Sequence, residues 1–293
     1  VSHIIIENLG KPRRVEKNTQ ITDDFFDVLA NNKIDVVIEA IVGVEPGFSY
    51  LSAALNKGIP IITANKALFA HKGRELEKIA RQNSCALGYE ATVAGGIPII
   101  RTLKDLLHIN EISKVEGVLN GTANFILSDM RETNHSFAES LATAQSLGYA
   151  EADPSNDILG TDAFYKLIIL SQTIFGDVPN WEDVEVVGID NIRAVDIEIE
   201  ALRGKRFKLI AEATRDESGE IKAQVKPRLV DSEHPLYGIE GVDNAVTLST
   251  DLLGELTLKG PGAGGDPSAS AVFSDLVALF SHQKGEVPRA LTR

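Results

Sequence analysis

The segment EADPSNDILGTDAFYK, which runs from Glu151 to Lys166, concentrates charge between two apolar helical patterns. Asp162 and Lys166 are four residues apart at the start of the second pattern, so on a helix they share a face and can form an ion pair. Glu151 and Asp157 stand just upstream, on an irregular stretch that contains Pro and Asn. A lysine held among carboxylates stays protonated and can donate a proton to a reacting oxygen. The segment is therefore either a proton-donating polar site or a solvated linker with an ordinary surface ion pair.

Three further segments place polar residues or glycines where strands are expected to end. ITANK ends at Lys66, directly after a buried strand pattern, and open α/β sheets bind ligands at the carboxyl ends of their strands. YEATVAGGIP, residues 89–98, has two glycines that allow backbone carbonyls or amides to face an ion. LNGTANF offers Asn120 and Thr122 at a turn into a helix. Each has an ordinary alternative, namely an exposed lysine at a helix start, a tight turn, and helix capping by Thr122.

The elements that must position these residues alternate in the first part of the chain. From Ile21 to about Leu119, short apolar runs follow helical patterns, which is typical of βαβ units around a largely parallel sheet. The runs at residues 34–41 and 59–65 are almost continuously apolar and rich in β-branched residues, which predicts buried central strands. Helices are predicted at residues 46–58 and 67–84, and a further strand at residues 85–91.

Beyond residue 95 the pattern changes to helices followed by strand pairs. SFAE, residues 136–139, is a Ser-x-x-Glu capping box for a helix that ends near Gly148. Two antiparallel strand pairs are predicted at residues 205–230 and 244–260, and a Gly-rich loop, GPGAGG, then leads into a helix that returns toward the first domain. Further helices are predicted at residues 95–109, 123–134 and 161–176, and a strand at 112–119. We expect an α/β domain at 1–95, an α+β domain with an antiparallel sheet at 96–255, and a returning segment at 256–293.

Composition narrows the class of protein. The chain has 293 residues, is 43% hydrophobic and carries a net charge of −13, which argues against nucleic acid or an anionic membrane as a partner. The single cysteine, Cys85, excludes an internal disulfide framework and is typical of a reducing compartment, so we expect a cytoplasmic protein. No stretch reaches the length of a membrane span, and no signal pattern opens the chain. The first residue is Val within a strand-like run, which is typical of a fragment.

Other kinds of chemistry find no support. The six histidines show no metal-binding spacing such as H-x-x-x-H, so a transition-metal site is not expected. No G-x-S-x-G element is present, and Cys85 falls in a predicted buried strand, so nucleophilic hydrolysis is not expected either. The GPGAGG loop could hold a phosphate, but it does not follow a first strand, and a glycine loop alone is weak evidence.

Taken together, six motifs in this order resemble homoserine dehydrogenases. The resemblance runs from about Thr22 to the end of the chain and is most specific in NGTANFIL and in the block from EADP to DAFYK. It implies a Rossmann-like parallel-sheet domain, incomplete at its N-terminus, with an α+β substrate and dimerisation domain. It also implies the NAD- or NADP-dependent interconversion of L-aspartate 4-semialdehyde and L-homoserine by a homodimer. The motifs are ITANK, YEATVAGGIPI, LNGTANFIL, EADPSNDILGTDAFYK, GVDNAV and GPGAGGDPSASAV.

The resemblance also implies a role for each motif. Lys166 is the expected catalytic acid or base, and Lys66 is the expected catalytic lysine where cofactor and substrate meet. The remaining implied residues are, for substrate, Glu151, Asp162, Asp157, Asn120, Gly121 and Thr122; for cofactor, Thr63, Asn65, Lys66, Gly262 and Gly264; and for a monovalent cation (Na⁺ or K⁺) held largely by carbonyls, Glu90, Val93, Gly95 and Ile97.

One feature of the family is missing from the start of the chain. Family members begin with a strand and a G-x-G-x-x-G turn that receives the cofactor pyrophosphate, whereas this chain begins with VSHIIIENLGKPRR. Either the given chain lacks about 30 to 45 preceding residues that carry this turn, or it is a natural truncation with weak cofactor affinity, and we expect the first. Lys11, Arg13 and Arg14 could meet an NADP 2′-phosphate or simply form an exposed basic loop. The alternatives are a non-catalytic paralogue that keeps the substrate pocket and dimer surfaces, and an oxidoreductase for another amino aldehyde. The residues given contain no regulatory amino-acid-binding module after the last helix, so feedback control through such a module is not expected.

Overall fold

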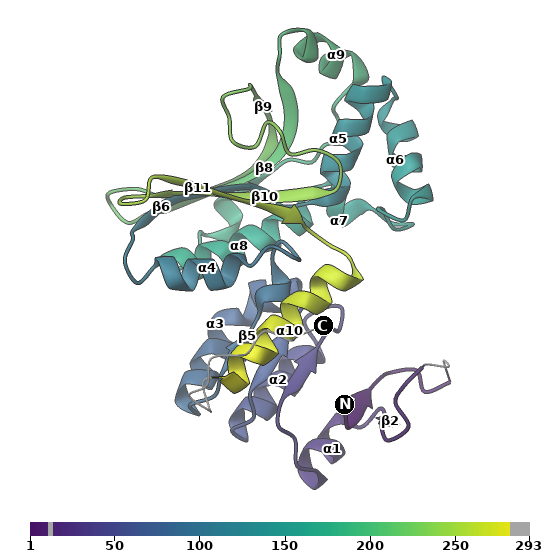
Figure 1. Cartoon of the computed structure of the whole chain (residues 1–293), viewed down its shortest axis with the longest axis vertical. Helices are drawn as coiled ribbons and strands as arrows, with labels where there is room; N and C mark the ends of the chain where they lie inside the picture. The colour runs from purple at the N-terminus through teal and green to yellow at the C-terminus, as the bar shows by residue number, and fades with distance from the viewer. Residues whose placement is uncertain (11–13, 282–293) are drawn as a thin grey trace, which may run out of the picture.

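The computed structural model describes residues 1–10 and 14–281 of the 293-residue chain. Figure 1 shows an upper part built around a broad sheet and a lower part built around a smaller one, joined by α10. The predicted class is confirmed, because parallel strands dominate the first part and mostly antiparallel strands the second. The division at residues 95 and 255 stays a prediction.

The lower part contains a three-stranded parallel sheet in the order β3-β4-β5. The central strand β4 is buried along its whole length, as its apolar run predicts. The prediction that residues 34–41 form a second buried central strand is wrong. Among the described residues β3 pairs only with β4, so it is an edge strand, and its Ile38 is 48% exposed. The elements are β3 (Val37–Glu39), α2 (Gly47–Asn56), β4 (Ile61–Thr63), α3 (Lys66–Gln82), β5 (Leu87–Gly88) and the short η1 (Glu90–Thr92).

The first residues form a small separate unit. Strands β1 (His3–Ile5) and β2 (Gln20–Thr22) pair in parallel, and α1 (Phe25–Asn31) follows them. Phe25 of α1 stacks on Tyr50 of α2, which joins this unit to the parallel-sheet region. Cys85, predicted in a buried strand, instead precedes the two-residue β5 and is partly exposed.

The upper part is a six-stranded sheet in the order β11-β10-β6-β8-β9-β7. Its pairs are antiparallel except that β7 runs parallel to β9, so the sheet is mixed rather than purely antiparallel. The long hairpins at β8–β9 and β10–β11 lie where the predicted strand pairs stand. The strands are β6 (Ile112–Val118), β7 (Glu185–Val186), β8 (Arg206–Arg215), β9 (Ile221–Val230), β10 (Asp243–Thr250) and β11 (Glu255–Pro261).

Helices cover this sheet unequally. Figure 1 shows α4 and α8 beneath it, while α5, α6 and α9 gather above one end. The α6 helix begins with the predicted capping box, in which Ser136 and Glu139 bond to each other's backbone. The helices are α4 (Ile99–Leu106), α5 (Gly121–Thr133), α6 (Phe137–Ser146), α7 (Ser155–Ile158), α8 (Thr161–Phe175), η2 (Trp181–Asp183) and α9 (Ala194–Leu202).

Two helices join the parts. The strongly apolar α8 packs against α3 below it and against the six-stranded sheet above it. After β11, the Gly-rich loop leads into α10 (Gly265–Ser281), which packs on β4, β5 and η1, so the chain does return to the first part as predicted. The first residues of α3 and α8 consequently meet between the two sheets. No helix within residues 1–10 and 14–281 is long and apolar enough to cross a membrane.

Candidate active site at the first turns of α3 and α8

The carboxylate of Asp162 is the centre of the charged segment. It lies in the first turn of α8 and is 3% exposed. Lys166 Nζ is 2.8 Å from its Oδ2, and Lys66 Nζ is 2.5 Å from its Oδ1. Burial alone would raise the pKa of Asp162, but the two ammonium groups lower it far below its ordinary value. Asp162 therefore remains ionised, and the predicted ion pair of Asp162 and Lys166 is present with a second lysine added.

Among the described residues, the ammonium of Lys166 has acceptors for two of its three hydrogens. Lys166 is 7% exposed, and its Nζ donates to Asp162 Oδ2 and, at 2.7 Å, to the carbonyl oxygen of Leu119. A lysine ammonium has three N–H donors, so these two acceptors fix the direction of the third. Lys166 is thus a buried, oriented proton donor rather than a solvated surface cation.

Asn120 orders the carboxylates around this pair. Its Nδ2 donates to Asp157 Oδ1 at 2.7 Å and to Asp162 Oδ2 at 2.8 Å, while its Oδ1 caps α5 by accepting from Ala123 N. Burial raises the pKa of Asp157, although the bond from Asn120 opposes that effect. The cap of α5 is therefore Asn120, and the capping role expected for Thr122 is wrong, because the Thr122 hydroxyl donates to Tyr149 O.

The remaining predicted substrate residues lie at the rim of this centre. Glu151 is exposed, and its charge acts on Lys66. Among the described residues, no acceptor binds the backbone N–H groups of Gly121 and Thr122, which lie in the first turn of α5. Gly121 has to be glycine, since a Cβ there would lie 2.7 Å from Val242 O.

Lys66 is the first residue of α3 and is half-exposed, with its ammonium turned to Asp162. Burial alone would lower the pKa of Lys66, but Asp162 raises it above its ordinary value. Before it, the side chains of Thr63 and Asn65 are occupied internally. Thr63 Oγ1 donates to Glu39 Oε2 at 2.5 Å, and Asn65 donates to Glu39 Oε1 at 3.2 Å while its Oδ1 caps α3. These two residues can therefore meet a cofactor only through their backbone.

Glu39 was missed by sequence reasoning. It ends β3, is 4% exposed, and accepts from Thr63, Asn65 and Ile41 N, so it braces the loop that leads to Lys66. An acidic residue at the end of the apolar run IDVVIEA was the available signal, because a buried carboxylate needs several donors.

The Gly-rich loop is shaped by its own packing. A Cβ on Gly262 would overlap the side chain of Asn244, at 2.0 Å from Cγ, and Gly264 has a φ of +118°. Both glycines are thus required by the fold, whatever the loop binds. A Cβ on Gly95 would lie 2.6 Å from Gly262 O, so this loop packs directly on the turn of the predicted cation residues.

That turn combines buried side chains with left-handed backbone. Ala94 and Gly95 have φ values of +54° and +50°. Within the described part of the chain, nothing donates a hydrogen bond to the carbonyl oxygens of Val93 and Gly95, whereas Ile97 O accepts from Ile99 N. The Glu90 side chain accepts from Ile100 N and Arg101 N, and burial raises its pKa.

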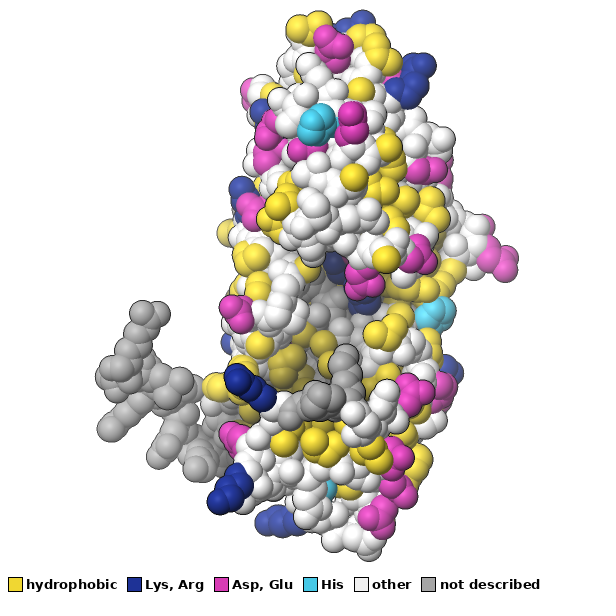
Figure 2. All heavy atoms as spheres, turned by 90° about the vertical axis from the view of Figure 1, so that its right-hand side faces the viewer, with side chains coloured by type: hydrophobic (Ala, Val, Ile, Leu, Met, Phe, Trp, Pro, Cys, Tyr) yellow, Lys and Arg dark blue, Asp and Glu magenta, His cyan; other side chains and the backbone are white. Residues whose placement is uncertain are grey.

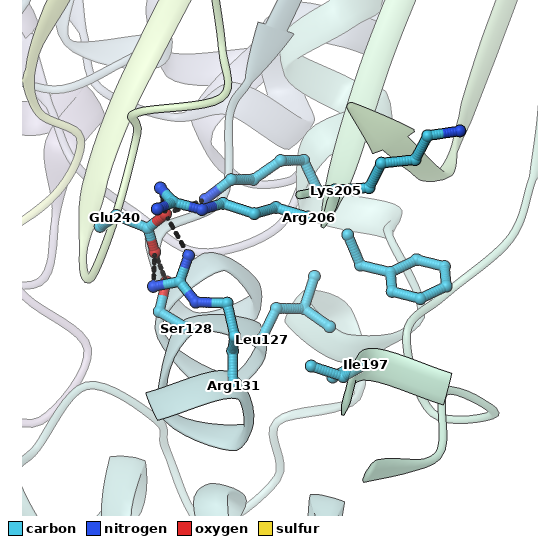
Figure 3. A pocket seen from close by; sticks show the side chains of 9 residues that line it. Leu127, Ser128, Arg131, Ile197, Lys205, Arg206 and Glu240 are labelled. Carbon is cyan, nitrogen blue, oxygen red and sulfur yellow. Dashed lines mark hydrogen bonds and ion pairs between the residues drawn. The ribbon is translucent and has the colours of Figure 1, made fainter. Parts of the chain in front are cut away.

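Figure 2 shows a hollow between the upper and lower parts of the molecule, with Lys or Arg side chains inside it. A cavity of about 10 Å³, room for about one water, lies elsewhere, between α5, β8 and Glu240. Figure 3 shows Arg131 and Arg206 converging there on Glu240. A further cavity of about 340 Å³ lies between residues 177–184 and 219–223. Neither cavity includes Asp162 or the two site lysines. Of the basic residues near the N-terminus, Lys11 and Arg13 lie outside the described residues, and Arg14 is exposed.

Comparison with known proteins now decides the family. A family model described as homoserine dehydrogenase matches residues 98–277, and one described as homoserine dehydrogenase, NAD binding domain, matches residues 3–90. The chain belongs to the homoserine dehydrogenase family. Its NAD-binding part and its Rossmann-like parallel sheet follow from the same match.

Individual relatives agree with the family match. A homoserine dehydrogenase of Bacillus subtilis strain 168 is 41% identical over 97% of this chain and 66% of the relative. A solved homoserine dehydrogenase from Thiobacillus denitrificans has a TM-score of 0.90 at 38% identity, covering 98% of this chain and 67% of that one. A hyperthermophilic archaeal homoserine dehydrogenase in complex with NADPH has a TM-score of 0.76 at 35% identity, covering 87% and 74%. The chain thus spans just under two thirds of the Bacillus relative.

Proposed function

We propose that this protein interconverts L-aspartate 4-semialdehyde and L-homoserine with NAD or NADP. The observation that carries the proposal is the buried Lys166 ammonium, with two N–H groups bound to Asp162 and Leu119 O and the third free for a substrate oxygen. Membership of the homoserine dehydrogenase family supports the choice of substrate.

The charged groups match a small zwitterion. The α-ammonium of homoserine requires carboxylates, which Glu151 and Asp157 supply beside the ion-paired centre. Its carboxylate requires donors, and the first-turn N–H groups of Gly121 and Thr122 at α5 are unused among the described residues. Asp162 is neutralised by its two lysines, so its role is to hold them in place.

Lys166 handles the proton at the reacting oxygen. In reduction of the aldehyde its free N–H donates to the developing alkoxide, and in oxidation its neutral form accepts the hydroxyl proton. Lys66 pairs with Oδ1 of Asp162, the oxygen that Lys166 does not contact. The negative charge of Asp162 is therefore shared between two ammonium groups. When bound, a nicotinamide cofactor supplies or accepts the hydride.

The chain's residues fit the nicotinamide end of such a cofactor. Strands β3 and β4 end at the edge from which Lys66 reaches Asp162, and ligands of open α/β sheets bind at this edge. The backbone at Thr63 and Asn65, the Lys66 side chain and the loop at Gly262 and Gly264 would border the cofactor. The NADPH complex of the archaeal relative supports this class of cofactor.

We also propose a monovalent cation at the turn of Glu90, Val93, Gly95 and Ile97. The carbonyl oxygens of Val93 and Gly95 are without donors among the described residues, and hard oxygen ligands suit Na⁺ or K⁺. The Glu90 carboxylate is bound to the start of α4, so its contribution would be its carbonyl or a rearranged side chain.

The activity is tested by following absorbance at 340 nm when homoserine is added with NAD or with NADP. We expect homoserine-dependent formation of the reduced cofactor, and a clear preference for one of the two. Absence of any change with either cofactor, in the product of the complete reading frame, would contradict the proposal and favour a non-catalytic paralogue. Reduction driven by another amino alcohol but not by homoserine would favour a related oxidoreductase.

A further inference from the structure

The carbonyl oxygen of Leu119 is shared by two donors. It lies just after β6, next to the cap residue Asn120, and accepts from Lys166 Nζ at 2.7 Å and from Asn244 Nδ2 at 2.8 Å. A carbonyl oxygen has two lone pairs, so these donors use both. The position of one acceptor of the Lys166 ammonium thus depends on the Asn244 side chain.

Asn244 has little freedom to move. It lies on β10 opposite Gly260 of β11 and is completely buried. Gly262 sits against its amide so closely that any Cβ on Gly262 would overlap it. Within residues 1–10 and 14–281, its Oδ1 has no hydrogen-bond partner, which is costly for a buried group and calls for a compensating role.

We propose that Asn244 is a positioning residue that aims Lys166 at the substrate oxygen, an inference that rests on the proposed function. Two acceptors orient the Lys166 ammonium, and an asparagine amide holds each one. Asn120 Nδ2 donates to Asp162 Oδ2, and Asn244 Nδ2 donates to Leu119 O. The same amide lies against Gly262, so the proton donor and the Gly-rich loop share one rigid support.

The expected consequence is a loss of turnover more than of substrate affinity. Asn244→Leu keeps the branching and the number of heavy atoms of the side chain but removes the N–H donor, which leaves the Leu119 carbonyl free to shift. A shift of about 1 Å in a reacting group can cost roughly 100-fold in rate, so we expect kcat to fall roughly 10- to 100-fold. The substrate itself does not touch Asn244, so KM for homoserine should change by less than about threefold.

Thr247→Val is the matched control. Thr247 is also buried on β10, and its hydroxyl bonds to Thr257 on β11 without reaching Leu119. This variant therefore loses a buried polar contact from the same strand β10, but one that is made to β11 and not to Leu119. Both variants should lower the melting temperature by a few degrees, and only Asn244→Leu should lower kcat.

A second readout does not require activity. The reaction of each lysine with acetic anhydride is followed by peptide mass spectrometry on both variants and the unaltered chain. Lys166, held by Asp162 and Leu119 O, should react slowly in the unaltered chain and in Thr247→Val, and several-fold faster in Asn244→Leu.

The outcomes separate this inference from the proposed function. Unchanged kcat with unchanged labelling of Lys166 in Asn244→Leu overturns the positioning role, as does an equal loss of kcat in both variants. If the product of the complete reading frame, without substitutions, turns over no homoserine, the proposed function fails, and the labelling of Lys166 alone decides whether Asn244 holds it.

Discussion

The free N–H of Lys166 is the single group on which turnover should depend most. Lys166→Met keeps much of the side-chain volume but removes the proton donor, while Asp162 keeps Lys66 and Asn120 as partners. We expect kcat to fall about 100- to 10,000-fold, with a much smaller change in the KM for homoserine. Steady-state kinetics at 340 nm measure both.

Lys72→Met is the control for this substitution. Lys72 is a half-buried lysine of α3 that pairs with Glu75, and no catalytic or binding role is predicted for it. It should leave kcat unchanged. A Lys166→Met enzyme that keeps more than about a tenth of the normal turnover would be too active for a lost general acid.

Lys208 provides a pH-dependent prediction outside the site. It is 1% exposed and contacts Glu240, Asn124 Oδ1 and Ile239 O, beside the cavity in Figure 3. Burial lowers its pKa to about 8, although Glu240 opposes the shift. Between pH 8 and the higher pKa of the unfolded chain, the unfolded state binds more protons, so this group makes stability rise with pH.

The measurement compares denaturant unfolding of the unaltered chain and Lys208→Met from pH 7 to pH 10. The difference in free energy of unfolding should grow in favour of the unaltered chain above pH 8, by at most about 1.4 kcal/mol per pH unit. Lys114→Met is the control, because the carboxylates of Glu212 and Glu116 raise the pKa of Lys114 despite its partial burial. For Lys114→Met, the difference in free energy of unfolding from the unaltered chain should stay constant up to pH 10. If the difference for Lys208→Met is also constant, Lys208 keeps its charge over this range and the prediction is wrong.

At the scale of elements, Gly95 joins the turn after β5 to the Gly-rich loop before α10. Gly95→Ala introduces a Cβ at a φ of +50° and 2.6 Å from the backbone oxygen of Gly262. We expect a loss of about 2 to 4 kcal/mol in unfolding free energy, from left-handed strain and from overpacking. Chemical denaturation measures this loss.

Gly219→Ala isolates the strain from the overlap. Gly219 has a φ of +88°, but a Cβ there would meet nothing within 4 Å. It should cost only about 1 to 2 kcal/mol. Equal losses at the two positions would mean that the loop moves away from Gly95 without cost, and that the contact between loop and turn is loose.

The local residue pattern was enough to predict most helices and strands, because the apolar runs, capping residues and turns that identify an element lie within it or at its ends. The apolar run of β4, the capping box at Ser136 and the two long hairpins are confirmed in place. The edge position of β3 was not predictable in this way, because burial of a strand depends on which distant strands pair with it.

The site shows the same limit. Asp162 and Lys166 could be paired from their spacing alone, since the contact lies within one helix. Lys66 contacts Asp162 across 96 residues of sequence. The acceptor at Leu119 is a backbone oxygen, which no residue type reveals. Thr122 and Asn120 are both residue types that cap helices, so the sequence does not decide between them. Tertiary packing decided each of these.

At the scale of the whole molecule, one face of the six-stranded sheet is only partly covered by helices (Figure 1). Its other face packs on α8. The partly covered face carries an ion-pair ladder in which Lys114 and Arg228 bind Glu212, whose pKa these partners lower to about 2 despite partial burial. We propose that a second copy of the chain binds this face, as the family resemblance implies for the antiparallel sheet.

Light scattering on the purified chain tests this arrangement. We expect a mass of twice the 31.6 kDa of the chain, and a shift toward monomer for Glu212→Lys, which places a third cation beside Lys114 and Arg228. Asp216→Lys makes the same charge reversal in the exposed turn between β8 and β9, so it should leave the dimer intact. A monomeric chain rules out the homodimer. An equally tight dimer in Glu212→Lys places its interface elsewhere, because a reversed charge in a ladder that the interface covers should weaken association.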